Sequence, residues 1–200
     1  MTNSNIRKQI ADILYDAFDD KIRYFWFLTS DKEKSKSLIA DYINYDQFLQ
    51  LKNDHGNVIA VATIETDDSG YAIDIPYSTF KKQFGLIGGL LRFVSYYIYK
   101  HSQDDTNANE MYIDLVAVKK SERNHGFGEQ LFKKIEEHGK KLNKPHIKLN
   151  VVNNNEAGKR FYERLGYKEI ASEEENAFFK LFTKKAGFTG HYTMFKDLNK

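Results

Sequence analysis

Apolar residues recur every three or four positions at the start of the chain, which is the spacing of one face of a helix. Residues 5–18 carry this pattern at Ile6, Ile10, Ile13, Leu14 and Phe18. Residues 33–45 repeat it with Leu38, Ile39, Tyr42 and Ile43. We therefore expect two helices at the N-terminal end, each with one face turned to the core.

Two runs of apolar and β-branched residues follow, on either side of the tetrapeptide Asp54-His55-Gly56-Asn57. Gly and Asn tolerate the positive φ values of tight turns, so this arrangement predicts a β-hairpin. Residues 66–82 are polar and show no period, and we expect them to be irregular.

The segment 83–100 has a helical apolar stripe formed by Ile87, Leu90, Leu91, Val94, Tyr97 and Ile98. We expect this helix to cover the core or a pocket. A helix lying on a membrane surface is the alternative. We do not expect stable membrane insertion, because the segment is about one turn short of the roughly 20 residues of a span and contains Arg92 and three glycines.

The order of elements becomes regular from residue 111. The run "MYIDLVAV" and residues 146–152 read as strands, and residues 127–142 and 156–165 as helices, the second stopped by Gly166. Two further strands, "YKEIAS" and "HYTMFKDL", complete the pattern. Strand–helix–strand order predicts an α/β domain with at least one parallel strand pair.

Composition narrows the class of protein. The chain has 200 residues, 41% of them hydrophobic and 29% charged, which suits one globular domain. A net charge of +2 is too small to indicate a nucleic-acid partner. The lack of cysteine excludes disulfides, thiolate nucleophiles and cysteine zinc sites, and we expect no metal. Because the N-terminus has no apolar signal core, we expect a cytoplasmic protein.

Two glycines, Gly126 and Gly128, lie between a predicted strand and a predicted helix. Without Cβ atoms they let an anion approach the unpaired N–H groups of the first helical turn, and Arg123 adds positive charge. The dinucleotide fingerprint would need glycine where Leu131 stands, and the Gly-Lys-Ser/Thr of a P-loop is absent. Taken alone, the two glycines could also form a tight turn without a ligand.

The hexapeptide Arg123-Asn124-His125-Gly126-Phe127-Gly128 resembles the acetyl-CoA motif of the GNAT N-acetyltransferase superfamily, R/Q-x-x-G-x-G/A after a strand. A second resemblance, "VNNNEAGKRFYERLGYKEI", follows about 30 residues later. The likeness covers 110–198 well and 5–66 loosely, and leaves 67–109 as an insertion. It implies one domain over residues 1–200, with a mixed, mostly antiparallel sheet, a central splayed parallel strand pair, helices on both faces and a helical insertion before the fourth strand.

The resemblance implies that acetyl-CoA is the co-substrate. Backbone groups of the strand would receive the pantetheine arm, and the amides of the glycine turn would hold the diphosphate. His125 stands where a Lys or Arg is common in the family, which leaves less positive charge at neutral pH. The implied binding residues are Val116, Ala117, Val118, Arg123, Asn124, His125, Gly126, Phe127, Gly128 and Asn155.

The implied reaction is direct acetyl transfer to a primary amine, without a covalent enzyme intermediate. Tyr162 occupies the family's usual position for the acid that protonates the thiolate. Asp114 is the first candidate for the base, because a carboxylate in an apolar strand is costly to bury unless it has a function. Glu110 is the second candidate, since alternate strand residues share a face. Ordered water in place of a side-chain base remains open.

Aromatic residues at 18–32 and 71–100, with acids nearby, would suit an amine with apolar parts, or could simply pack the core. We assign Trp26, Tyr24 and Tyr112 to the acceptor site and expect 67–109 to act as a substrate lid. The acceptor is a small-molecule or peptide amine. A non-catalytic acyl-CoA-binding module on the same fold is the alternative function, and a homodimer is an expectation from family analogy.

Overall fold

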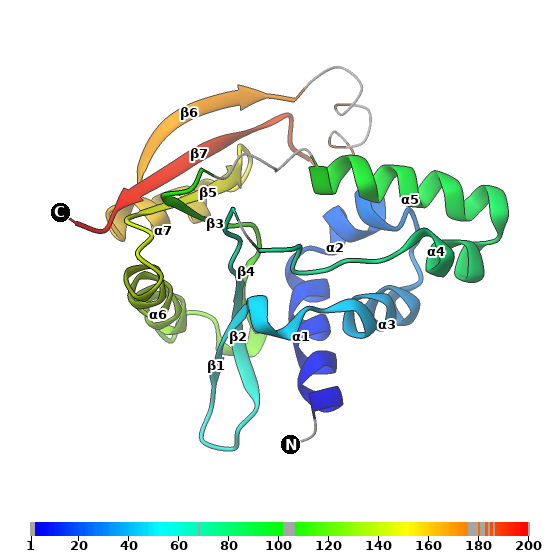
Figure 1. Ribbon diagram of the computed structural model, residues 1–200, viewed down its shortest axis with the longest axis horizontal. Helices are drawn as coiled ribbons and strands as arrows, with labels where there is room; N and C mark the ends of the chain where they lie inside the picture. Colours follow the sequence, from blue (N-terminus) through cyan, green and yellow to red (C-terminus); the bar gives the residue numbers. More distant parts are fainter. Residues whose placement is uncertain are drawn as a thin grey trace.

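The computed structural model of the chain describes residues 3–67, 69–101, 107–175, 180, 183, 185 and 187–199. It contains two sheets that meet at the centre of the molecule (Figure 1). The first is antiparallel with the order β1-β2-β4, and the second has the order β3-β5-β7-β6. In the second sheet β3 and β5 are parallel and the other pairs are antiparallel. The strands are β1 (Phe48–Lys52), β2 (Val58–Thr63), β3 (Glu110–Ile113), β4 (Val116–Val118), β5 (His146–Val152), β6 (Lys168–Glu174) and β7 (Gly190–Asp197).

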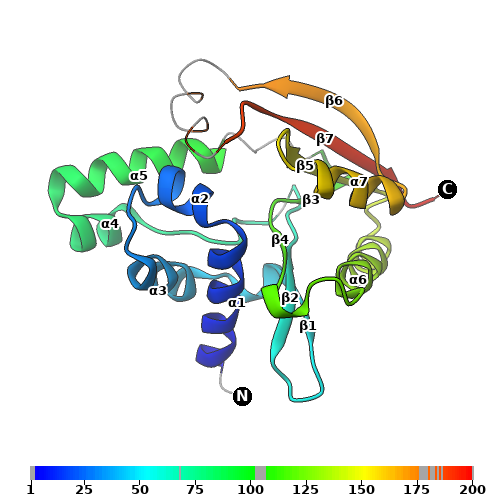
Figure 2. The same cartoon turned by 180° about the vertical axis from the view of Figure 1, so that it is seen from behind.

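Helices flank the sheets on two sides, with α1 and α3 on one side and α6 and α7 on the other, and the edge strand β6 stays exposed (Figures 1 and 2). Strand β2 is buried along its whole length because its residues face two cores in turn. Val61 belongs to the core under α1, whereas Ala60 and Ala62 belong to the core under α6. The helices are α1 (Asn3–Ala17), α2 (Asp19–Lys21), η1 (Ile22–Trp26), α3 (Lys32–Tyr42), η2 (Tyr45–Gln47), α4 (Tyr77–Phe84), α5 (Leu86–His101), η3 (Lys120–Glu122), α6 (Phe127–Lys141) and α7 (Glu156–Arg164).

The predicted strand at 111–118 is broken in the structure by a bulge. Tyr112 exchanges two backbone hydrogen bonds with Glu65, and the Leu115 carbonyl accepts one from the Thr63 amide. Between these two hydrogen-bonded positions, the chain advances by three residues on one side (112 to 115) and by two on the other (65 to 63). The stretch from 112 to 115 therefore contains one extra residue, which is a β-bulge. The Thr63 hydroxyl accepts a hydrogen bond from the Leu115 amide and fixes the far side of the bulge. Asp114 lies within this irregular stretch.

The parallel pair β3–β5 separates at the bulge. Its register ends with Ile113 opposite Leu149. Beyond that point β4 pairs with β2, whereas β5 continues the pairing with β7 that runs from His146 to Val152. The prediction of a central splayed parallel pair within a mostly antiparallel sheet is thereby confirmed.

The insertion contains α4 and α5 and lies between β2 and β3, so it precedes the third strand and not the fourth as expected. The expectation that 66–82 would be irregular is wrong for α4. The expected orientation of α5 is also wrong, because its aliphatic stripe faces outward, with Ile87 83% exposed. Its inner face consists of Gly89 and aromatic residues such as Tyr96, which lie against α4 and the N-terminal core. A Cβ on Gly89 would lie 2.6 Å from the Phe80 carbonyl oxygen, so close helix contact decides which face is buried. Among the described helices, none has the length and apolar character required to cross a bilayer.

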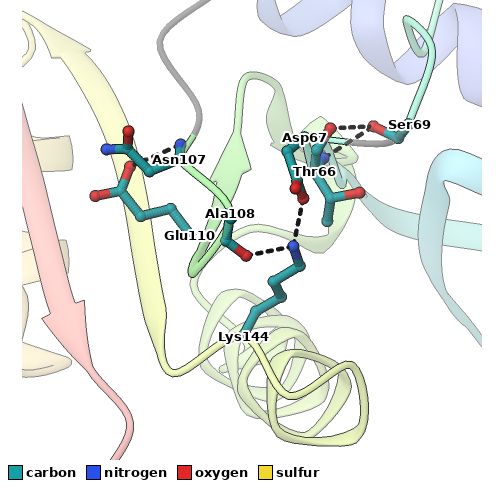
Figure 3. A network of polar contacts seen from close by, with 7 residues as sticks. All are labelled: Thr66, Asp67, Ser69, Asn107, Ala108, Glu110 and Lys144. Atoms are coloured by element: carbon teal, nitrogen blue, oxygen red, sulfur yellow. Dashed lines mark hydrogen bonds and ion pairs between the residues drawn. The ribbon is translucent and has the colours of Figure 1, made fainter.

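Both ends of the insertion are held by one lysine (Figure 3). The Lys144 ammonium donates to the Ala108 carbonyl at 2.6 Å and forms an ion pair with Asp67. Lys144 lies in the short connection between α6 and β5, and its side chain is only 14% exposed. This contact ties the start and the end of the insertion to the body of the domain.

Candidate functional site

The glycine turn has the conformation of an anion site. Asn124 and Gly126 both have positive φ, 64° and 78°, and Gly126 is the N-cap of α6. Asn124 thus adopts the left-handed conformation, which asparagine tolerates better than most residues other than glycine. A Cβ on Gly126 would meet nothing within 4 Å, so the approach to the turn is open. The first hydrogen bond of α6 runs from Gln130 to the Gly126 carbonyl at 3.1 Å, which leaves the earlier amides without a helical acceptor.

Gly128 serves a different purpose from Gly126. A Cβ at Gly128 would lie 3.1 Å from the ring of Phe161 on α7. The absence of a side chain at this position therefore allows α6 and α7 to approach each other. The open space expected at both glycines is present at Gly126, whereas Gly128 faces Phe161; that the turn receives a ligand stays a prediction.

Charged residues of the turn lie at the surface. The Arg123 Nε donates to the Val118 carbonyl at 3.2 Å, which folds the turn back onto the end of β4. His125 is exposed, and its ring centroid is 6.3 Å from that of Phe127. Arg123 therefore fixes positive charge next to the open amides.

Strand β4 turns one hydrogen-bonding edge away from β2, which follows from its register with that strand. Thr63 donates to the Leu115 carbonyl and Lys119 donates to the Ile59 carbonyl. Since hydrogen-bonded pairs alternate in an antiparallel ladder, Ala117 also directs its N–H and C=O toward β2. Val116 and Val118 direct theirs toward the gap before β5. Ala117, expected as a third backbone contact, is thus engaged by its own sheet.

A cleft with about 430 Å³ of space occupies the gap between β4 and β5. It brings together several residues that the sequence singled out: Val116, Asp114, Asn155 and Tyr162. Asn155 also caps α7, because its side chain accepts a hydrogen bond of 3.0 Å from the Gly158 amide. The cap orients this side chain at the rim of the cleft.

Tyr162 reaches the cleft from α7 and is half-buried. Its ring packs on Phe132, with centroids 5.4 Å apart, and on Tyr167 at 6.2 Å. Burial raises the pKa of Tyr162 to about 12. The hydroxyl therefore retains its proton at neutral pH and can donate it to an anion in the cleft.

Asp114 is surrounded by partners that the sequence did not indicate. The Tyr99 hydroxyl donates to its Oδ1 at 3.0 Å, and the Lys21 ammonium is 3.6 Å from the same atom. The Asp114 side chain is 16% exposed. Its carboxylate is therefore half-buried, and the hydrogen bond and the ion pair offset the cost of its desolvation. Tyr99 and Lys21 come from α5 and α2, and no sequence spacing connects them with the strand.

Glu110 is not brought to the cleft. It lies at the opposite end of β3, and its carboxylate accepts a hydrogen bond of 3.4 Å from the Asn107 amide (Figure 3). Strand alternation predicted that Glu110, Tyr112 and Asp114 share one face, but β3 ends at Ile113 and Asp114 lies in the bulge beyond it. In this structure Glu110 stabilises the turn that leads into β3.

A second cavity, of about 80 Å³, adjoins the cleft. The two share five lining residues: Lys21, Asp114, Asn150, Val152 and Phe188. The second cavity adds aromatic side chains from three segments and an ion pair in which His191 Nδ1 is 3.4 Å from Glu175 Oε1. Its other lining residues are Phe25, Tyr99, Tyr112, Glu175, Thr183 and His191.

The three predicted acceptor residues are therefore dispersed. Tyr112 lines the second cavity with Asp114. Trp26 lies behind it, buried in a smaller cavity with Tyr99. Tyr24 is half-buried against Arg23, whose guanidinium carbon is 5.4 Å from its ring, and does not line these cavities.

This combination of a splayed strand pair, an open glycine turn and an adjoining cleft defines the acetyltransferase fold of the GNAT type. A family model described as "Acetyltransferase (GNAT) family" matches residues 10–167, and the chain belongs to this family. No curated protein matches the sequence significantly.

Solved structures agree with this fold. An acetyltransferase structure has 21% identity and a TM-score of 0.59, covering 98% of this chain and 96% of its own. An N-acetyltransferase from Staphylococcus aureus Mu50 has 16% identity and a TM-score of 0.64, with 96% of each chain covered. A protein from Streptococcus mutans has 16% identity and a TM-score of 0.58, covering 99% and 96%. At these identities the likeness concerns the fold.

Proposed function

We propose that this protein is an N-acetyltransferase that moves an acetyl group from acetyl-CoA directly to a primary amine. The observation that carries the proposal is the cleft between β4 and β5, which places Asp114 and Tyr162 in one cavity. An acid and a base in one cleft are what transfer from a thioester to an amine requires.

The donor would be held by the outer edge of β4 and by the glycine turn. The N–H and C=O of Val116 and the N–H of Val118 suit an extended amide-containing arm, which would add to β4 like a further strand, while the Val118 carbonyl accepts a hydrogen bond from Arg123. The open amides at Gly126, with Arg123 beside them, suit a diphosphate. Acetyl-CoA would supply the thioester-bound acetyl group at the point where β4 and β5 diverge.

The chain's own residues would move two protons. Asp114 would accept a proton from the attacking ammonium, because an amine must be neutral to act as a nucleophile. Tyr162 would protonate the departing thiolate, since burial keeps its hydroxyl neutral. Tyr99 would position Asp114 through its hydrogen bond.

The acceptor would enter through the second cavity. Aromatic side chains beside carboxylates favour a cationic amine with apolar parts, either a small molecule or a peptide. The insertion at 67–109 would act as a lid over this cavity, since Tyr99 on α5 forms part of its lining.

A panel of primary amines tests the proposal, with acetyl-CoA as donor and release of free thiol as the signal. We expect at least one amine to be acetylated and to show saturation. Tyr162→Phe and Asp114→Asn should lower kcat, while calorimetry shows nearly unchanged CoA affinity. If CoA binds and no amine releases thiol, the protein is a non-catalytic acyl-CoA-binding module, and the proposal fails.

A further inference from the structure

The Lys21 ammonium occupies a cage built from aromatic rings and one carboxylate. Its Nζ lies 4.3 Å from the ring centroid of Tyr99, 5.6 Å from that of Phe18 and 5.8 Å from that of Trp26. Asp114 Oδ1 closes the cage at 3.6 Å. Such a cage binds a cationic amine through cation–π attraction and charge. In this chain it holds an amine that belongs to the protein itself.

The Lys21 ammonium lies where the two cavities of the site meet. Lys21 lines both the cleft between β4 and β5 and the adjoining second cavity. Asp114 and Asn150 also line both, and they directly follow Ile113 and Leu149, the last residues of the β3–β5 register. Lys21 therefore reaches the point where the strands diverge, with its Nζ beside the proposed base.

We propose that Lys21 is a site of self-acetylation, modified by the donor bound to the same chain. This inference depends on the proposed function, because it uses the same donor, acid and base. An external amine and Lys21 would compete for the same position beside Asp114.

The step balances without any further reagent. Asp114 takes a proton from the Lys21 ammonium, and the neutral Nζ forms an amide bond with the acetyl carbon. The bond between that carbon and the donor sulfur breaks, and the thiolate takes a proton from Tyr162. The second amine proton replaces the one that Tyr162 gave up, and Asp114 releases its proton to solvent, so that the products are acetyl-lysine, the free thiol and one proton.

Acetylation would remove the positive charge of Lys21. The ion pair with Asp114 and the cation–π contacts would be lost together. The modified side chain would also fill part of the acceptor route. We therefore expect acetylated protein to turn over external amines more slowly than unmodified protein.

Lys36 provides a matched control within the chain. Its side chain is 18% exposed, against 22% for Lys21, and it also pairs with an aspartate, Asp12, at 2.6 Å. It lies 5.9 Å from the ring of Tyr15. Lys36 thus shares the burial, the ion pair and the aromatic neighbour of Lys21, but it does not line the cleft.

The experiment incubates the full-length protein with acetyl-CoA that carries a deuterated acetyl group and maps labelled lysines by peptide mass spectrometry. We expect label on Lys21 at a rate independent of protein concentration and at least about a hundredfold faster than on Lys36. Tyr162→Phe should slow the labelling, and a saturating amine substrate should protect Lys21. In Lys21→Arg this label should be absent, whereas CoA binding measured by calorimetry should persist.

Three results overturn the inference in distinguishable ways. If calorimetry shows CoA binding and amines release thiol, but Lys21 carries no more label than Lys36, self-acetylation is wrong and the proposed function stands. If CoA does not bind, both fail. Labelling whose rate rises with protein concentration also contradicts the inference, because it shows transfer between molecules.

Discussion

The hydroxyl of Tyr99 donates a hydrogen bond of 3.0 Å to Oδ1 of Asp114, which connects the inserted helix α5 with the bulge after β3. Burial and the nearby Asp114 charge raise the pKa of Tyr99, so its proton stays on the phenol oxygen. The insertion thus contributes directly to the environment of the proposed base.

Replacing Tyr99 with Phe keeps the ring and removes this hydrogen bond. A hydrogen bond to a charged group is worth about 1.5–3 kcal/mol, so we expect kcat/KM to fall by roughly ten- to a hundredfold. The steady-state rate with the best amine measures this. Tyr97 lies two residues before Tyr99 on α5 and is 49% exposed. Tyr97→Phe is therefore the control, and it should leave the rate unchanged. Equal rates for Tyr99→Phe and the wild type would remove Tyr99 from the account.

The acid role of Tyr162 predicts a specific pH dependence. Because its pKa is raised to about 12, the proton is retained as the pH passes 10, the ordinary pKa of tyrosine. We expect Tyr162→Phe to lower kcat by about a hundredfold at neutral pH. In the wild type, kcat should not fall as the pH passes 10. A fall near pH 10 that is absent in Tyr162→Phe would show that Tyr162 loses its proton at the ordinary tyrosine pKa, which would contradict the prediction.

Substitutions at Gly126 distinguish the effect of backbone strain on stability from the effect of a side chain on CoA binding. Gly126→Ala places a side chain at a φ of 78° and should cost about 1–2 kcal/mol of stability. Gly126→Asn should cost less, since Asn tolerates this conformation, as Asn124 does nearby. Both fill the open space before the amides, so both should weaken CoA binding in calorimetry. Unchanged affinity in both variants would place the diphosphate elsewhere.

Lys144 should stabilise the domain by holding the insertion. Lys144→Ala removes the contacts with Asp67 and the Ala108 carbonyl, and we expect it to lower the free energy of unfolding by about 1–2 kcal/mol. Urea denaturation measures this, and amide exchange should rise at residues 69–75. Lys140→Ala on the exposed face of α6 is the control. Equal losses in the two variants would contradict a specific role for Lys144.

Periodic and local features of the fold were predictable from the sequence. Strand β5 and helices α6 and α7 follow from clear alternation and helical spacing, and the αL positions follow from Asn124 and Gly126. The glycine turn and the position of Tyr162 were accessible through a motif, because short-range spacing determines both.

Long-range relationships were not predictable. Nothing in the local pattern indicates that α2 and α5 bring Lys21 and Tyr99 to Asp114. The outward stripe of α5 was misread because Gly89 and aromatic residues can pack more closely on α4 than the aliphatic residues can. The bulge depends on register with β2, which one strand cannot reveal.

The most direct test of the account is a crystal structure of the protein with CoA, supported by calorimetric titration. The account predicts saturable binding, with the pantetheine arm hydrogen-bonded to Val116 and Val118 and the diphosphate on the amides at Gly126. No heat of binding, or CoA bound away from the gap between β4 and β5, would contradict it.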